Sequence, residues 1–260
     1  MIIVADNLRI TIPAISRAVE TNDPGPVRKL VIQCRDAGAN AIDINSGPLS
    51  RYPAKQMRFL VDAVRAVTDL PLVLDTSNPE ALAVGLACCE GNAIINGISL
   101  EPAKLSRILP LAHAYDCDVI GYLLDANGHV PPDAEGRMEA AVALFGKCQA
   151  AGILAERLIV DPVVAPLAWP DGNRQNMAIL EVIRTLPDLL GFPVRTIAGL
   201  SNLTTGAPDD ARRRICQSAF LPMLAAAGTT FVLMNVLDPH LVAVASACRK
   251  ICENGIFSWD

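Results

Sequence analysis

The sequence predicts an α/β fold, a single TIM-type (β/α)8 barrel that spans residues 1–260 as one domain. Short runs that are apolar at every position alternate with longer segments of helical periodicity, about 32 residues per unit, and no Gly/Ser-rich or Pro-rich linker divides them. Fully apolar runs are typical of strands buried on both faces, as in a parallel sheet. The alternative is an open doubly wound sheet. Because the sequence has no Gly-rich nucleotide fingerprint, we favour the closed barrel.

Each predicted strand ends at or beside a carboxylate or an amide. The clearest example is Pro71–Leu74, an apolar run that is followed at once by Asp75. A carboxylate in that position is costly to desolvate unless backbone amides or a ligand bind it. The predicted strands are Ile2–Ala5, Asn40–Ile44, Pro71–Leu74, Ala93–Asn96, Asp118–Leu124, Arg157–Val160, Val194–Leu200 and Phe231–Met234.

A helix is expected after each strand. The first is predicted to follow Asp23 as its cap, with Pro24 at the first helical position, and the residues before it are expected to form a loop. The predicted helices are Pro24–Ala37, about Ala54–Val67, Pro79–Cys89, Pro102–Tyr115, Asp133–Ala151, about Arg174–Leu186, Ala211–Ala227 and Pro239 to about Cys252.

The charge of the chain argues against a nucleic-acid partner. The net charge is −5, and the basic run Arg212–Arg214 stands beside Asp209 and Asp210. The first residues carry no basic region, and no window approaches the ~20 apolar residues that span a bilayer. We therefore expect a cytoplasmic protein without membrane contact.

The eight cysteines are expected to be reduced thiols. They lie in apolar segments and form no CxxC pair of the kind that binds zinc or an iron–sulfur cluster. Cys248 and Cys252 share a helix face, but no second pair completes a metal site, so packing is the better interpretation and no metal is expected.

The active site of a (β/α)8 barrel lies at the carboxyl ends of its strands. Here these ends carry carboxylates and amides, without a histidine, a lysine suited to a Schiff base or a phosphate-binding glycine run. Such a set suits a flat, neutral, nitrogen-rich heterocycle, because a carboxylate can accept two N–H donors. The residues are Asp6, Asn7, Asp43, Asn45, Asp75, Asn96, Asp125, Asp161, Asn202, Asn235 and Asp238.

A purely structural role is an alternative for each of these residues. Asp43, Asp125 and Asp238 are as well explained by helix capping or turn formation as by binding. Asp6 and Asn7 are as well explained by the first turn.

The order of the motifs resembles the pterin-binding family, over essentially the full length. Within it the chain is most similar to methyltetrahydrofolate:corrinoid protein methyltransferases. The similarity rests on five motifs in order: Asp43-x-Asn45-x-Gly47-Pro48, Leu74-Asp75-Thr76/Ser77-Asn78, Ile95-Asn96-Gly97, Val160-Asp161-Pro162 and Gly199-Leu200-Ser201-Asn202.

The resemblance implies roles for particular residues. Asp75, Asn96 and Asp161 match residues that bind the pterin ring, and Asp43 in the first motif is also expected there. Asn202 matches a mobile asparagine that approaches N5 of the folate. With Asp75 or Asp161 it is expected to be catalytic. Arg213 matches an arginine near the pterin.

The resemblance further implies a methyltransferase that acts between tetrahydrofolate or 5-methyltetrahydrofolate and the cobalamin of a corrinoid protein, in either direction. A homodimer is expected by analogy. Many relatives have Gly-Glu-Arg-Ile-Asn where this chain has Ala5-Asp6-Asn7-Leu8-Arg9, so the role of the first loop is open.

Other functions remain as alternatives. A non-catalytic folate-binding module would need the ring-binding residues but not Asn202. A dihydropteroate synthase-like enzyme would need a lysine with an Arg/His set for pyrophosphate, and a barrel aldolase or isomerase would need a lysine or a base–metal pair.

Overall fold

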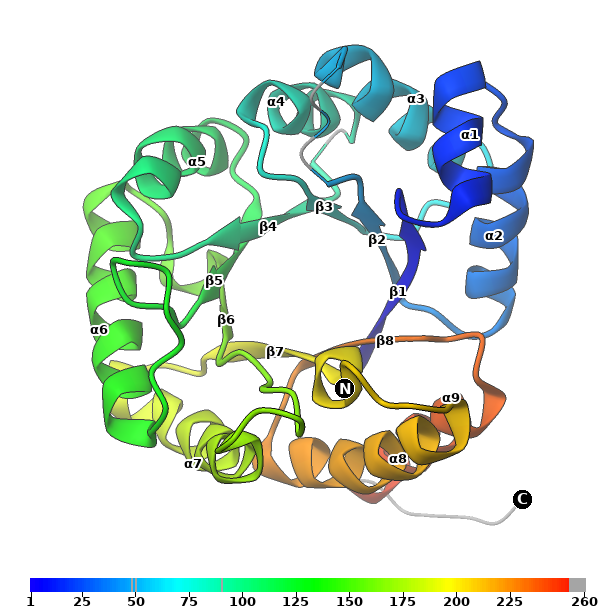
Figure 1. Cartoon of the computed structure of the whole chain (residues 1–260). Helices are drawn as coiled ribbons and strands as arrows, with labels where there is room; N and C mark the ends of the chain where they lie inside the picture. The colour runs from blue at the N-terminus through cyan, green and yellow to red at the C-terminus, as the bar shows by residue number, and fades with distance from the viewer. Residues whose placement is uncertain (48, 50, 90, 253–260) are drawn as a thin grey trace.

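The chain forms a closed parallel barrel surrounded by helices (Figure 1). The computed structural model describes residues 1–47, 49, 51–89 and 91–252. Within these residues, eight strands pair in sequence order and β8 closes on β1. The strands are β1 (Ile2–Arg9), β2 (Ala41–Asn45), β3 (Leu72–Asp75), β4 (Ala93–Ile98), β5 (Asp118–Tyr122), β6 (Leu158–Asp161), β7 (Arg195–Gly199) and β8 (Phe231–Met234). The predicted single barrel is confirmed.

The helices lie on the outside of the barrel (Figure 1). They are α1 (Pro13–Thr21), α2 (Gly25–Asp36), α3 (Pro53–Arg65), α4 (Pro79–Cys88), α5 (Pro102–Ala114), α6 (Ala134–Ala150), α7 (Gly172–Leu190), α8 (Asp210–Ala227) and α9 (Pro239–Cys252), with short 3₁₀ turns η1 (Ala155–Arg157) and η2 (Leu200–Thr204). None of the helices in the described part of the chain is both long and apolar enough to cross a membrane.

The expectation of a loop before the first barrel helix was wrong, because α1 occupies that segment. Pro13 stands at its start, where a missing N–H costs nothing. Ile15, Ala18 and Val19 share one face at helical spacing and are buried.

Two apolar layers hold the barrel together. Outward-facing strand residues such as Ile44 and Leu74 pack against the helices in the large core. Inside the barrel, each strand contributes one residue to a separate apolar layer: Val4, Ala41, Val73, Ile94, Ile120, Ile159, Ile197 and Phe231. Because side chains alternate along a strand, this inner layer identifies which residues face the barrel axis.

Candidate functional site

A ring of mainly polar side chains lies at the mouth of the barrel, two residues beyond the inner apolar layer. Strand periodicity returns each of these residues to the inward face at the carboxyl end of its strand. The strand registers agree, since Asp75 pairs with Asn96 and Tyr122 pairs with Asp161. We call this set the mouth ring: Asp6, Asp43, Asp75, Asn96, Tyr122, Asp161, Gly199 and Leu233.

Neighbouring strands link the mouth ring by hydrogen bonds. The Asn45 side chain donates to Asp75 Oδ2 at 2.6 Å, and the Tyr122 hydroxyl donates to Asn96 Oδ1. Asp43 is buried, and its Oδ1 has no hydrogen-bond partner among the described residues. A buried acceptor without a partner is costly, so this atom is suited to an N–H donor from a ligand.

Burial raises the pKa values of the ring acids. It raises the pKa of Asp75 to about 6, against the opposing effect of the Arg9 guanidinium. It raises the pKa of Asp161 to about 7, although the Val163 N–H, 2.8 Å from Asp161 Oδ1, favours the ionised form. For Asp43 burial and the nearby negative charges of Asp75 and Asp6 raise the pKa well above its usual range. At neutral pH the ring can therefore both hold and accept protons.

Asn202 lies beside the one ring position that has no side chain. A Cβ atom built on Gly199 would be 3.0 Å from Asn202 Nδ2, so the amide of Asn202 covers the space that Gly199 leaves. Asn202 is exposed, and it lies on the short turn η2, which follows β7 directly. The amide thus borders the ring while keeping access to solvent.

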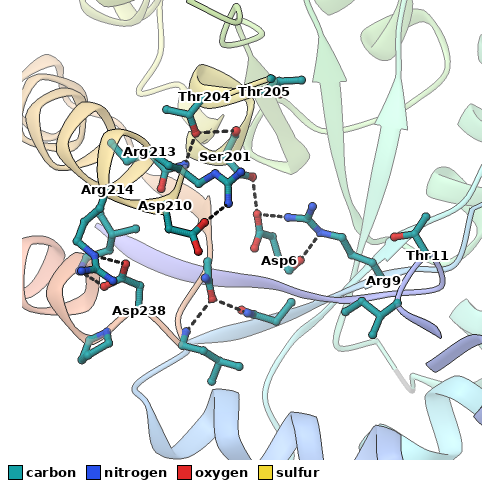
Figure 2. A pocket seen from close by; sticks show the side chains of 18 residues that line it. Asp6, Arg9, Thr11, Ser201, Thr204, Thr205, Asp210, Arg213, Arg214 and Asp238 are labelled. Carbon is teal, nitrogen blue, oxygen red and sulfur yellow. Dashed lines mark hydrogen bonds and ion pairs between the residues drawn. The ribbon is translucent and has the colours of Figure 1, made fainter. Parts of the chain in front are cut away.

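A bulge in β1 brings a cation to the ring. Between Ala5 and Leu8 the pairing with β2 gains one residue, and Arg9 then lies opposite Asn45. Such a bulge re-aims the side chains beyond it. Arg9 binds Asp6 Oδ2 at 2.6 Å, and the Ser201 hydroxyl donates to the same oxygen at 2.5 Å (Figure 2).

Beside the ring lies a hollow of about 600 Å³, between β1, η2, α8 and the start of α9. We call it the arginine hollow, because Arg9, Arg213 and Arg214 line it (Figure 2). Arg213 pairs with Asp210 and Arg214 with Asp238, each at 2.7 Å. Arg213 therefore faces this hollow.

Comparison with known proteins decides the family. The model of the family described as pterin binding enzyme matches residues 10–235. The chain belongs to the pterin-binding enzyme family. One relative is 26% identical over 258 residues, which cover 98% of this chain and 92% of that protein: the methylcorrinoid:tetrahydrofolate methyltransferase of Eubacterium limosum.

Other relatives cover less or show the fold alone. The methionine synthase of Mycobacterium tuberculosis is 25% identical over 215 residues, 78% of this chain but 17% of that protein. Dihydropteroate synthase from Stenotrophomonas maltophilia with bound imidazole has a TM-score of 0.69 at 18% identity, covering 90% of this chain and 91% of that one. The enzyme from Xanthomonas albilineans, in complex with indole-2-carboxylic acid and 6-chloroguanine, has a TM-score of 0.67 at 20% identity, covering 95% and 90%.

The structure brings together most of the residues predicted for the site of this pterin-binding enzyme. Asp43, Asp75, Asn96 and Asp161 lie in the mouth ring, and Asn202 borders it. The motif residue Pro48 lies outside the described residues.

Other predicted strand ends lie elsewhere. Asp125 lies on the exposed loop after β5, where its Oδ1 accepts the N–H groups of Asn127 and His129. Asn7 bonds Asn235 at 2.6 Å, and Asp238 accepts the His240 N–H at the start of α9.

Two contributors to the site, Tyr122 and Arg9, were not singled out from the sequence, whereas Asp6 was. Tyr122 was missed because the apolar run continues to Leu124, although the strand ends at Tyr122. Arg9 could be placed beside the ring only once the bulge in β1 was known. Counting two residues beyond the inner apolar residue Ile120 would have found Tyr122.

Proposed function

We propose that this protein is a methyltransferase that moves a methyl group between N5 of tetrahydrofolate and the cobalt of a corrinoid carried by a partner protein. The observation that carries the proposal is the mouth ring, with its inward acids and amide. The similarity over 98% of the chain to a methylcorrinoid:tetrahydrofolate methyltransferase supports the choice of reaction within the family.

The ring has the chemistry that the pyrimidinone edge of a pterin requires. That edge offers N–H donors and a carbonyl acceptor, which suit the Asp75 and Asp161 carboxylates and the Asn96 amide. The unpartnered Asp43 Oδ1 supplies a further acceptor. A hollow of about 270 Å³ opens beside Asp75, Asn96 and Tyr122.

The reaction needs a proton at N5. When the methyl group leaves, charge develops on N5, and a hydrogen-bond donor or an acid must stabilise it. We assign Asn202 to donate to N5. We assign Asp161, with a pKa of about 7, to hold or accept the proton through water, since it is partly protonated at neutral pH.

This orientation also gives Arg213 a role. With the pyrimidinone edge against β3, β4 and β6 and N5 near Asn202, the substituent at C6 points away from that edge, toward β8 and β1. The arginine hollow lies there. We therefore assign Arg213 and Arg214 to the carboxylates of the p-aminobenzoyl-glutamate tail, with the corrinoid protein covering the mouth.

The test compares binding with transfer in the purified protein. Methyltetrahydrofolate is titrated by calorimetry, a Co(I) corrinoid is then added, and the methyl–cobalt absorbance is followed. We expect Asn202→Ala to lower the transfer rate about 100-fold and to change the folate Kd by less than about threefold. Asn127→Ala, on the exposed loop after β5, is the matched control and should change neither.

Each other outcome has a defined meaning. Binding without transfer by the unmodified protein would favour a folate-binding module. Equal transfer by the Asn202→Ala variant would refute the role of Asn202, and an absence of folate binding would refute the proposal as a whole.

A further inference from the structure

Arg137 on α6 is a fully buried arginine that the proposed reaction does not use. Its Nε donates to the Pro162 carbonyl at 3.1 Å, its Nη2 to Gln175 Oε1 at 3.2 Å and its Nη1 to the Asp133 carbonyl at 3.5 Å. Burial lowers its pKa to about 10. Burying a guanidinium whose hydrogen-bond partners are carbonyl and amide oxygens costs free energy of folding, which suggests that Arg137 has a role at this position.

The carbonyl that Arg137 holds begins the loop that follows Asp161. The next residue, Val163, has a φ of 65°, a left-handed conformation that a β-branched side chain disfavours. In this conformation the Val163 N–H points at Asp161 Oδ1, 2.8 Å away. The strained residue therefore supplies a hydrogen bond to a mouth-ring acid.

A second buried side chain holds the same loop further along. Asn176 on α7 is 3% exposed, and its amide bonds both backbone groups of Ala165, with distances of 2.8 Å to the carbonyl and 3.0 Å to the N–H. We call Arg137, Gln175 and Asn176 the loop clamp. Strain in a loop persists only where surrounding contacts impose it, and the loop clamp provides such contacts.

We propose that Arg137 is a positioning residue for Asp161. By holding the Pro162 carbonyl it keeps Val163 in the left-handed conformation in which the Val163 N–H binds the Asp161 carboxylate. The effect of Arg137 on methyl transfer rests on the proposed function, whereas the effect of Arg137 on the Asp161 carboxylate does not.

The proposal predicts a measurable change in Asp161. A hydrogen bond to the ionised form lowers the pKa of a carboxyl group, so its loss raises that pKa. The titratable groups beside Asp161 are Tyr122 on β5 and, further round the ring, Asp75 and Asp43; α6 contributes Arg137 beneath the loop. None of these ring groups is a hydrogen-bond partner of Arg137, so we expect them to stay in place when Arg137 is replaced.

The experiment measures the pKa of Asp161 by ¹³C-carboxyl NMR in the folate-free, full-length protein, with the signal assigned by its absence in Asp161→Asn. We expect Arg137→Met to raise the pKa of Asp161 by at least about half a pH unit. The matched control is Arg157→Met. Arg157 pairs with Asp116 and Asp118 at the opposite end of β6, so its loss should leave the Asp161 signal unchanged.

Gln175→Met keeps the test decisive if Arg137→Met folds poorly, and Val163→Gly tests the role of backbone strain. Gln175→Met removes one partner of the guanidinium and should raise the pKa of Asp161 by a smaller amount. Val163→Gly removes the need for the loop clamp, because glycine adopts a positive φ without strain. Arg137→Met should therefore shift the pKa of Asp161 less in the Val163→Gly protein than in the unmodified protein.

The outcomes separate the two proposals. An unchanged pKa of Asp161 in Arg137→Met, or in Gln175→Met where the first variant does not fold, would overturn the positioning role whatever the activity. A shifted pKa in a protein that transfers no methyl group would uphold the positioning role and reject the proposed function.

Discussion

Replacing Asp161 by asparagine should stabilise the protein at high pH. Burial raises the folded-state pKa of Asp161 to about 7, against an ordinary value of 3.8. A carboxyl group whose pKa is higher in the folded state binds its proton more tightly there, so it stabilises the fold fully at pH values below its unfolded-state pKa. This stabilisation is lost as the pH rises through the folded-state pKa. Asparagine is neutral throughout, so it avoids this loss.

The size of the effect follows from the two pKa values. A difference of about 3 pH units, at about 1.4 kcal/mol each, gives about 4 kcal/mol as an upper bound. Because Asp161 is only half-buried, we expect solvent screening to reduce this gain to about 2 kcal/mol. Because ionisation in the unfolded chain begins near pH 4, about 1.5 kcal/mol of this gain should develop between about pH 5 and about pH 8.

The assay is urea unfolding followed by circular dichroism, for the unmodified protein and Asp161→Asn at both pH values. Asp125→Asn is the control, because backbone N–H groups lower the pKa of the exposed Asp125 and its replacement should bring no gain at high pH. A stability difference for Asp161→Asn that does not grow with pH would refute the reasoning. The same variant should transfer methyl groups poorly, so here stability and activity oppose each other.

Three other changes test neighbouring parts of the structure. Arg9→Gln removes the cation whose charge opposes the effect of burial on Asp75, so the pKa of Asp75 should rise above about 6. Because the ionised carboxylate is the form that accepts the N–H donors of the pterin, folate affinity should then recover only at higher pH, as measured by calorimetry from pH 6 to pH 9. Arg213→Gln should weaken the binding of methyltetrahydrofolate triglutamate about threefold and leave a tetrahydropterin without the tail unaffected; equal loss for both ligands would place Arg213 at the ring instead. Gly172→Ala should cost about 3 kcal/mol in urea unfolding, because the new Cβ would lie 2.1 Å from a backbone carbonyl oxygen, whereas Gly146→Ala on α6 meets nothing within 4 Å and should be neutral or stabilising.

Much of the fold could be predicted from the sequence because strand and helix periodicities are local properties. The apolar runs predicted β3 and β8 within one residue, and the expected strand ends at Asp75 and Asp161 agree with the ends of β3 and β6, whereas β4 continues past Asn96 to Ile98. Where an apolar run continued past the strand, the predicted end of that strand was wrong. The run to Leu124 hid the end of β5 at Tyr122.

The sequence by itself determined the repeating β/α pattern, the barrel and most of the acids and amides at its mouth, because hydrophobic periodicity and the polar residues after apolar runs can be read from consecutive residues. Only the tertiary structure decided that a bulge turns Arg9 toward the acids, that the Asn202 amide covers the space beside Gly199, and that Arg137 donates to the Pro162 carbonyl next to Asp161. The bulge depends on the pairing of β1 with β2, and the Arg137 contact joins residues 25 apart in sequence, so no local pattern predicts them. The raised pKa values have the same origin, because burial is a property of the folded assembly of strands and helices.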